Sequence, residues 1–566
     1  GVMLGTASAA DRFWVGANGT WNNTANWSAT SGGGGSAGVP GATDMAIFDG
    51  NGTGNCDIDA NISVLGLRME AGYTGTNTQS AAWTITTGTN GLIVSNGVFL
   101  GGAGNITVGT ADASYFTLAG GRFRSTTNVF LVRSGFTISG GTFEHNNGTV
   151  TFGRGGGTGA GDWKTAPALV KSGGAIFYRV QFEAASNWNR TLADDMTVLE
   201  NFYHVNGHLN SIDLATGTTG TNTITLAGDF ITLGAYYFSY HGRINLVMNG
   251  AADQTISNAN PTVANYSYLR LNKSDGSVKL KSNAIFGGLE IPAGQTFDCS
   301  PDNGTNDYGL YVTASGWSIF TNAGTFYARS QTNTFGPPAG NGVIPFYNTG
   351  TFNASNSTTV FGGTAPADET TYYRTPLLSG GTVFHDVTIA MAANHNRKLL
   401  DDLYVNGNLV ISRGDIQPSG TWSIYLTGDY THSSIYTFGN SANLTLVMNG
   451  TNQTISQNSG TFSATLLITN GTTVALGTNL TTAASRYLDV ATNSTFDLSG
   501  RNLTVGSGTT YFRLYGTLRL RGDEVTVTTP TLNSGCTVSY YGIDGTPVTV
   551  RNWAYKTLKL DGPGRE

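Results

Sequence analysis

An internal repeat restricts what this chain can fold into. The 26 residues GGAIFYRVQFEAASNWNRTLADDMTV at Gly173–Val198 return as GGTVFHDVTIAMAANHNRKLLDDLYV at Gly380–Val405, with twelve identical positions at an offset of 207. Downstream, LAGDF returns as LTGDY and LVMNG returns unchanged, both at an offset of 200. Because residues are gained or lost only between matched segments, turns absorb the length changes while strands keep their register. This behaviour predicts coils stacked along one axis.

Within the repeat, one short pattern recurs: an aromatic residue, two variable positions, then two apolar residues separated by one. It occurs as Phe177/Val180/Phe182, Phe384/Val387/Ile389, Tyr266/Leu269/Leu271 and Tyr555/Leu558/Leu560. Residues two apart in a strand share one face of the sheet. Stacked coil on coil, these positions predict ladders of like residues that fill the core of a parallel solenoid.

The composition agrees with an all-β chain. Glycine accounts for 79 of 566 residues, charged residues for only 11%, and there are 27 Phe and 25 Tyr. The aromatic content argues against disorder, and glycine with β-branched residues indicates short strands joined by turns. We therefore predict a parallel β-helix or β-solenoid, built from tandem super-repeats of about 200 residues with a Trp-rich N-terminal cap.

The pattern divides the chain into six segments. We expect a signal-peptide remnant or donor strand at 1–10, the capping segment at 11–73, the first coils at 74–133, super-repeats at 134–343 and 344–531, and a partial third repeat at 532–566. The three cysteines lie far apart, in no disulfide or metal spacing. Cys299 stands where the second copy has Leu498, so we expect it to be a small buried hydrophobe.

The first ten residues, GVMLGTASAA, have the small and apolar character of the end of a secretory signal. They predict export to the cell surface. Alternatively, Val2, Met3 and Leu4 form an apolar strand that is kept for pairing with another copy.

Three tryptophans, Trp14, Trp21 and Trp27, lie close together near the N-terminus. A solenoid needs its first coil covered, and large aromatic rings cover an open apolar end well, so we expect them to form a lid. The alternative is an aromatic platform that stacks on sugars.

Two resemblances suggest a class of protein. The segment that contains these tryptophans resembles the opening of large bacterial surface proteins and autotransporter-like passengers at Trp14, Trp21, Asn26, Trp27, Pro40, Asp44 and Phe48. The repeats over Ser134–Glu566 resemble those of bacterial adhesin-type and filamentous surface proteins predicted to be β-helical. Both resemblances imply an extracellular β-solenoid.

The third repeat stops after YKTLKLDGPG, where earlier copies continue, which predicts an unpaired ladder edge. We expect another copy of the chain to cover it by strand pairing, so that a head-to-tail homopolymer forms. The alternative is a truncated precursor. The expected polymer contacts are Val2, Met3, Leu4, Trp14, Trp21, Trp27, Tyr555, Leu558 and Leu560.

Few residues suggest chemistry. The pairs Asp194/Asp195 and Asp401/Asp402 could serve as the acid and base of a polysaccharide hydrolase, but they are duplicated and adjacent, which favours corner residues over catalysts or calcium ligands. His204 and His208 have the i, i+4 spacing of a helical zinc site, yet the intervening Val-Asn-Gly indicates a turn.

Two oxygen-rich loops are weak calcium candidates. They contain Asp49, Asn51 and Asp57 in the first loop and Asp302 and Asp307 in the second. Calcium accepts such ligands, but neither loop has the EF-hand spacing, and Asn, Asp and Gly are ordinary turn residues. No other cofactor and no catalytic residue is predicted.

The net charge of −6, with basic residues thinly spread, predicts no nucleic-acid partner, and no apolar run predicts a membrane-spanning helix. We therefore expect an exported, non-enzymatic structural protein of the bacterial cell surface, a subunit of an extracellular filament or adhesin shaft. Its expected partners are copies of itself and surface glycans. The alternative is a β-helical polysaccharide lyase or hydrolase, or a carbohydrate-binding surface protein.

Overall fold

The computed structural model describes residues 9–109, 114–154, 162–185, 188–234, 237–259, 267–313, 319–336, 344–363, 374–391, 396–439, 443–506, 508–545 and 547–562. The chain divides into two compact units, Gly1–Ile285 and Phe286–Glu566, here called unit 1 and unit 2. Both are parallel β-solenoids, with about 21 turns in the two units together. This confirms the predicted fold class.

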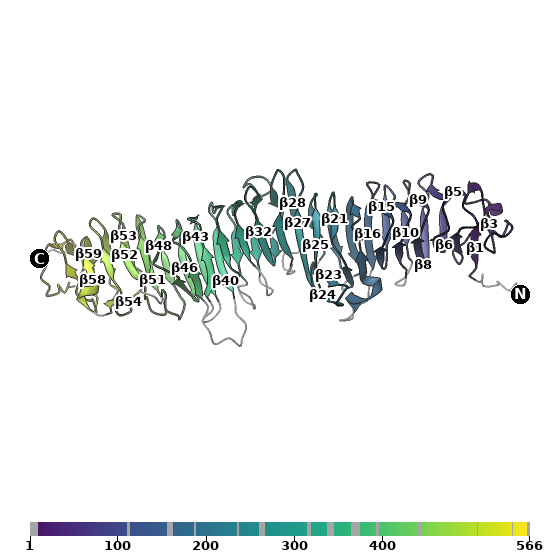
Figure 1. The fold of residues 1–566 in the computed structure, drawn as a ribbon. Coiled ribbons are helices and arrows are strands. Elements are labelled where there is room, and N and C mark those ends of the chain that lie inside the picture. The colour runs from purple at the N-terminus through teal and green to yellow at the C-terminus, as the bar shows by residue number, and fades with distance from the viewer. Residues whose placement is uncertain are drawn as a thin grey trace. The chain divides into compact units, whose positions relative to one another are not determined.

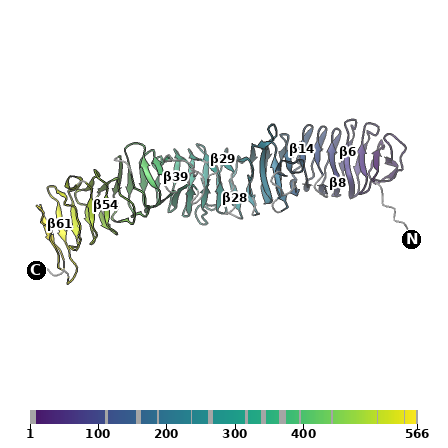
Figure 2. The ribbon, with the colours of Figure 1, turned by 90° about the horizontal axis from the view of Figure 1, so that it is seen from below.

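The strands of each unit form three parallel ladders, one on each side of the coil, in which strands from successive turns lie side by side (Figure 1, and from below in Figure 2). The ladders of each unit are numbered so that the strands of the two repeated 26-residue segments, β18 (Ile176–Phe177) to β21 (Met196–Val198) and β42 (Val383–Phe384) to β45 (Leu403–Val405), carry the same ladder numbers. Helix is confined, within the described residues, to single 3-10 turns: η1 (Thr24–Asn26), η2 (Asp162–Lys164), η3 (Ala166–Ala168) and η4 (Thr509–Tyr511).

In unit 1, ladder I consists of β8 (Ile85–Val94), β10 (Ile106–Val108), β13 (Val129–Val132), β16 (Thr149–Arg154), β19 (Arg179–Ala184), β22 (Phe202–Asn206), β26 (Phe230–Thr232), β28 (Gln254–Asn258) and β30 (Val278–Leu280). Ladder II consists of β1 (Asp11–Trp14), β4 (Met45–Phe48), β6 (Ile62–Met69), the second half of β8, β11 (Phe116–Leu118), β14 (Phe136–Ile138), β17 (Leu169–Lys171), β20 (Asn189–Leu192) and β23 (His208–Asp213). Ladder III begins with β2 (Asn18–Thr20), β5 (Asn55–Ile58), β7 (Thr76–Gln79), β9 (Val98–Leu100), β12 (Arg122–Arg124) and β15 (Thr142–Glu144). It resumes with β18 (Ile176–Phe177), β21 (Met196–Val198), β25 (Thr221–Leu226), β27 (Arg243–Met248) and β29 (Tyr268–Leu271). Two short strands, β3 (Trp27–Ser28) and β24 (Thr218–Thr219), pair antiparallel with β1 and β23.

In unit 2, ladder I consists of β34 (Leu310–Val312), β37 (Thr332–Phe335), β40 (Thr358–Gly363), β43 (Asp386–Met391), β46 (Leu409–Arg413), β49 (Tyr430–His432), β51 (Asn452–Gln457), β53 (Thr473–Leu476), β56 (Thr495–Asp497), β59 (Thr517–Leu520), β61 (Thr537–Tyr540) and β62 (Leu558–Leu560). Ladder II consists of β32 (Gly288–Ile291), β35 (Phe320–Asn322), β38 (Phe346–Asn348), β41 (Arg374–Leu378), β44 (Asn396–Leu399) and β47 (Asp415–Pro418), and later of β54 (Leu480–Thr482) and β57 (Leu503–Val505). Ladder III begins with β33 (Thr296–Asp298), β36 (Thr325–Tyr327) and β39 (Thr351–Asn353). It resumes with β42 (Val383–Phe384), β45 (Leu403–Val405), β48 (Trp422–Leu426), β50 (Leu444–Met448), β52 (Thr465–Ile468), β55 (Leu488–Val490), β58 (Phe512–Leu514) and β60 (Thr531–Leu532). The boundary between the units falls within β31 (Ala284–Phe286), inside the first predicted super-repeat.

The two tandem copies fold alike. Phe177 ends β18 and Phe384 ends β42, and both side chains are buried. Val180 and Phe182 in β19, like Val387 and Ile389 in β43, face the interior. The predicted sharing of one face by residues two apart is therefore confirmed at these positions.

Aromatic rings stack along ladder III in each unit. The ring centroids of Phe99 and Phe123 are 5.0 Å apart, and those of Phe326 and Phe352 are 4.8 Å apart. These separations match the spacing of neighbouring strands, because each ring sits on the ring of the previous turn. Such stacks give the coil a continuous apolar core.

The tryptophans form the predicted lid over the first coil of unit 1. The ring centroid of Trp27 lies 5.3 Å from that of Trp14 and 4.7 Å from that of Trp21, and all three side chains are buried. Phe48 packs against the same rings. Since β3 and β4 pair with β1 on its two edges, this first strand has no free edge. The rings point inward, so the cluster does not offer the ring faces that a sugar-stacking platform needs.

Candidate functional site

Ladder III of unit 1 is interrupted between β15 and β18. On one side β15 pairs with β12, and across the described residues no strand pairs with its other edge. In a parallel ladder, alternate residues bond to opposite neighbours. Thr142 N–H and Glu144 C=O bond toward the β12 side, so the backbone N–H and C=O of Phe143 face the interruption.

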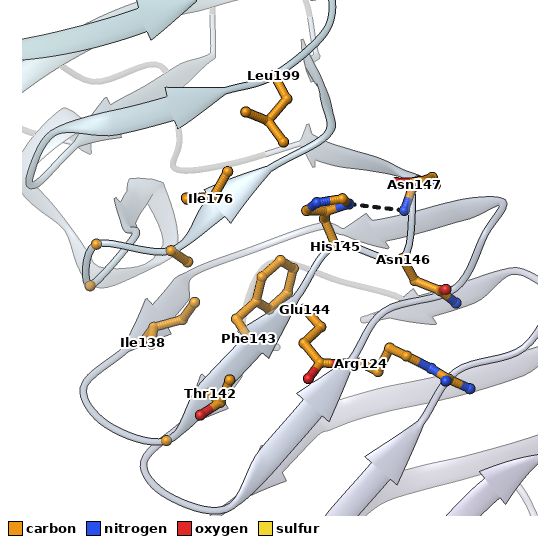
Figure 3. Close-up of a pocket in the computed structure, with 14 residues that line it drawn as sticks. Arg124, Ile138, Thr142, Phe143, Glu144, His145, Asn146, Asn147, Ile176 and Leu199 are labelled. Carbon is orange, nitrogen blue, oxygen red and sulfur yellow. Dashed lines mark hydrogen bonds between the residues drawn. The ribbon is translucent and has the colours of Figure 1, made fainter.

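A groove of about 670 Å³ opens at this interruption, here called the β15 groove (Figure 3). Phe143 lies at its base, and Ile176 and Leu199 lie across from it. Ile176 and Leu199 are 47% and 44% exposed, which is unusual for aliphatic side chains on a polar outer surface. The groove therefore combines a free strand edge with an apolar wall.

Several polar side chains at the rim of the groove are bonded within the protein, whereas Arg124 Nε is buried without a hydrogen-bond partner in the described residues. Arg122 Nε and Nη2 donate to the two carboxylate oxygens of Glu144 at 2.6 and 2.8 Å. Asn146 Nδ2 donates to two backbone carbonyls, and His145 Nδ1 accepts from Asn147 N–H at 3.0 Å (Figure 3). The Arg122 hydrogen bonds lower the pKa of Glu144, so this carboxylate stays ionised and paired near neutral pH.

The second copy has the same interruption, between β39 and β42, but a side chain bridges it. Asn348 Nδ2 donates to Gly350 O at 3.2 Å, Ser379 O at 3.0 Å and Thr382 Oγ1 at 2.8 Å. The equivalent residues of the first copy, Ile138 and Ala175, have no polar side-chain atoms and cannot form this bridge. The first copy therefore lacks a hydrogen-bonded bridge that the second copy has, while Val383, the counterpart of Ile176, is similarly exposed at 50%.

The paired aspartates hold corners, as the sequence indicates. Asp194 accepts hydrogen bonds from Ser172 N and Gly173 N at 2.6 and 2.7 Å, and Asp401 accepts the equivalent bonds from Ser379 N and Gly380 N at 2.8 and 2.7 Å. The turn needs glycine because Gly173 has a φ of 59°. The next residue of each pair also bonds to backbone, Asp195 to Thr223 N and Asp402 to Ser423 N.

The two histidines of HVNGH do not converge. His204 is buried in β22, where its Nε2 lies 2.7 Å from Gly207 O, and burial lowers its pKa to about 4. His208 belongs to β23 and stacks on Tyr237 and Tyr240. Across the part of the chain that the structure describes, no three His, Cys, Asp or Glu side chains form a group that could hold a metal ion.

Turn contacts use some oxygen atoms of the two calcium candidates, whereas Asp57 Oδ1 and Asp307 Oδ1 are buried without a hydrogen-bond partner in the described residues. Asp49 Oδ1 accepts from Asn51 N at 2.9 Å, and Asp57 lies in β5. Asp302 accepts from Ser300 Oγ, Thr305 N and the backbone and side-chain amides of Asn306, and these bonds lower its pKa. Asp307 Oδ2 accepts from Ser330 N at 3.0 Å. These are the contacts of ordinary turns.

The predicted polymer contacts have different surroundings. Val2, Met3 and Leu4 lie outside the described residues. Trp14, Trp21 and Trp27 are buried, so any contact near them would use neighbouring groups. Leu558 and Leu560, at 41% and 54% exposure, lie on β62, which pairs with β61 on one edge and with no other strand of the described residues. Tyr555 donates its hydroxyl to Arg551 O.

Surface aromatic rings stack on one another in both units. Tyr404 and Tyr425, on neighbouring strands of unit 2, have centroids 4.9 Å apart and planes within 6°. In unit 1, Tyr240 stacks on His208 at 4.4 Å and on Tyr237 at 5.0 Å. Sugars stack on exposed ring faces, and these rings cover part of one another's faces.

Neither Arg190 nor Arg397 received a role from the sequence, although both are identical between copies. Both side chains are buried and bond to backbone carbonyls. The residues of the β15 groove were missed as well. The two copies differ at Ile138 and Ala175, which accounts for the missing bridge, but no sequence signal marks the groove itself.

The fold places the protein in the class of parallel β-solenoids. Comparison of the chain with family models, curated proteins and solved structures gives no match. In the described part of the chain, no helix has the length and apolar character needed to cross a bilayer. The three cysteines are free and buried.

Proposed function

We propose that this chain is an exported structural protein of a bacterial cell surface, a subunit of an extracellular filament or of a stiff adhesin shaft. The observation that carries the proposal is the unbroken backbone pairing of ladder I in each unit, which joins successive turns and is accompanied by stacked aromatic side chains. A solenoid of this kind grows by adding turns, and each turn supports its neighbours. Length and stiffness are therefore the properties that the fold provides most directly.

We propose that assembly uses the outer edge of β62, which pairs with no strand in the described part of the chain. An unpaired edge with exposed apolar side chains readily accepts another strand, and Leu558 and Leu560 provide such side chains. We propose that a second copy supplies that strand, which makes a head-to-tail contact that does not close and so extends into a filament. Because β1 is paired on both edges, the donor would be the apolar segment that contains Val2, Met3 and Leu4.

Sedimentation of the full chain over a range of concentrations tests this contact. We expect the chain to form polymers and Leu558→Lys/Leu560→Lys to remain monomeric, because two buried lysines at a strand–strand contact would be unpaired charges. Ile435→Lys, at a 75% exposed position away from β62, is the matched control and should polymerise normally. A monomeric parent chain, or equal polymerisation of the double variant, would contradict the proposal.

Surface glycans remain proposed partners of such a shaft. The alternative function, a polysaccharide lyase or hydrolase, is tested by incubating the protein with pectin and alginate and measuring their chain length. The structural proposal expects no shortening, and progressive shortening would replace it with the enzymatic one.

A further inference from the structure

We propose that Tyr404 and Tyr425, on the outer face of ladder III in unit 2, form an oxidative modification site, where hydrogen peroxide and a haem peroxidase join the two rings as dityrosine. This modification goes beyond the structural role proposed above and does not depend on filament formation, because both rings belong to one chain. Three observations carry it: the pairing of the two residues in register, the contact between their rings, and the absence of this pair from the first copy.

The sheet holds the two tyrosines side by side. Tyr404 of β45 and Tyr425 of β48 are direct partners in the parallel ladder. Their neighbours along each strand are buried, so both phenol rings lie on the outer face, where they are partly exposed. The ring centroids are 4.9 Å apart and the planes lie within 6°. In the described part of the chain neither ring contacts any other aromatic ring, so each is the nearest partner for a radical formed on the other.

The coupling reaction can be written with all atoms accounted for. The peroxidase removes one electron and one proton from each phenol, which leaves two tyrosyl radicals. A carbon–carbon bond then forms between the Cε atoms beside the two hydroxyl groups, and each of these carbons gives up its hydrogen as the aromatic ring is restored. In total, two C–H bonds break, one C–C bond forms, and the two hydrogen atoms reduce one hydrogen peroxide to two waters.

The surroundings of Tyr404 favour the neutral phenol as the starting group. Partial burial, followed by the negative charges of Asp402, Tyr425 and Asp401, raises the pKa of Tyr404. The ring therefore carries its proton at neutral pH, and oxidation removes the electron and the proton together. A neutral radical results, so the two coupling rings do not repel each other.

The tyrosine pair is a feature of the second copy and not of the fold. In the first copy the equivalent partners in ladder III are Thr197 and Thr225, which pair in the same register. The three cysteines of the chain are free and buried, so no disulfide joins the turns of either unit. A bond between Tyr404 and Tyr425 would be a covalent link between two successive turns.

Two other pairs of stacked tyrosines provide internal comparisons. Tyr487 and Tyr511 have centroids 5.0 Å apart but planes inclined at 43°, and the Arg513 guanidinium lies 4.1 Å from the Tyr487 ring. A cation over a ring face opposes removal of an electron from that ring. Tyr237 and Tyr240 are also 5.0 Å apart, yet both stack on a histidine ring as well, which restricts the rotation that coupling needs. We expect less product at both of these pairs.

The test uses the full chain, dilute, with a haem peroxidase and hydrogen peroxide. Dityrosine fluorescence gives the yield, and mass spectrometry of proteolytic peptides gives the position. We expect a linked pair of peptides that contain Tyr404 and Tyr425, lighter by two hydrogen atoms than the two peptides together. The yield per chain should not change on dilution, because rings held in contact react intramolecularly. The treated chain should also unfold at a higher temperature, since a crosslink restricts the unfolded state.

Matched variants locate the reaction. Tyr404→Phe and Tyr425→Phe keep the ring but remove the phenol, and each should lower the yield of this crosslink at least about tenfold. Tyr311→Phe, at a 36% exposed position elsewhere in unit 2, should leave the yield unchanged. Thr197→Tyr/Thr225→Tyr places the pair in the first copy and should create a second crosslink there.

Three results would overturn the proposal. The first is no crosslink between Tyr404 and Tyr425 under conditions in which N-acetyltyrosine amide couples. The second is an equal or greater yield at Tyr487 and Tyr511. The third is dityrosine that joins only separate chains and disappears on dilution. None of these readouts depends on polymerisation, so the modification site can fail while the structural role stands.

Discussion

Arg190 and Arg397 occupy equivalent positions in ladder II of the two copies. The side chain of each lies in the interior and donates hydrogen bonds to backbone carbonyls of successive turns. Arg190 donates to Val132 O at 2.9 Å and to Gly153 O at 2.8 Å. Arg397 donates to Phe335 O at 2.8 Å and to Gly362 O at 2.9 Å. Burial lowers the pKa of each guanidinium to about 9, yet carbonyl oxygens satisfy most of its donors. Each arginine therefore joins several turns of the coil.

Replacing either arginine should destabilise the protein. Arg190→Met and Arg397→Met leave several buried carbonyls without donors, so we expect a loss of about 2–4 kcal/mol in the free energy of unfolding. Denaturant unfolding followed by circular dichroism measures it. Arg413→Met, at an exposed position in β46, is the matched control with an expected change below about 0.5 kcal/mol. Equal stability of the three variants would contradict the structural role.

Acid should weaken the fold through two buried histidines. Burial lowers the pKa of His204 and of His432 to about 4 from a usual value of 6.5. The unfolded chain therefore binds more protons between these values, so the stabilisation present above about pH 6.5 is lost as the pH falls toward 4. For His204, the difference between the unfolded and folded pKa values corresponds to a loss of at most about 3 kcal/mol in the free energy of unfolding. Unfolding measured over this pH range tests that value.

His432→Phe provides the control for this pH dependence. Both ring nitrogens of His432 are buried and without hydrogen-bond partners in the described residues, so an apolar ring should fit better. We expect His432→Phe to raise stability at neutral pH by about 1 kcal/mol and to flatten the slope between pH 6.5 and 4. If stability depends on pH in the variant as steeply as in the parent chain, His432 does not contribute to the loss of stability in acid.

Removing a corner carboxylate should loosen one turn. Asp194→Ala deprives Ser172 N and Gly173 N of their acceptor, at an expected cost of about 1–2 kcal/mol. Hydrogen exchange should accelerate at those two amides, and Asp401→Ala should do the same at Ser379 and Gly380. Asp544→Ala, at an exposed turn, should leave exchange at both corners unchanged.

The tryptophan lid, although small, should contribute strongly to the stability of the protein. Trp27→Ala removes the ring that contacts Trp14, Trp21 and Phe48, and a cavity of that size costs about 3–5 kcal/mol. The loss is expected as a lower unfolding midpoint with increased exposure of the remaining tryptophans to fluorescence quenchers. Trp83→Ala, at a 36% exposed position, should change the midpoint little.

The ladders could be predicted from the repeat, because residues that align between the copies must occupy equivalent places in the coil. Once Phe177 and Phe384 align without gaps, the strands that carry them must occupy equivalent turns, and the structure places them in β18 and β42. The tryptophan lid was predictable for a similar reason, since the first coil of a solenoid has an apolar end to cover.

The β15 groove and the buried arginines were not predictable in the same way. The first copy has Ile138 where the second copy has Asn348, and only the folded chain shows which groups the Asn348 amide joins. The burial of Arg190 runs against the usual exposure of charged side chains. It becomes understandable only in the folded chain, where carbonyls of β13 and β16 converge on the guanidinium.

The most direct test of the central claim is negative-stain electron microscopy of the purified full chain at several concentrations. The structural account predicts unbranched filaments that lengthen with concentration and are lost in Leu558→Lys/Leu560→Lys. Discrete particles of one size at every concentration would contradict it.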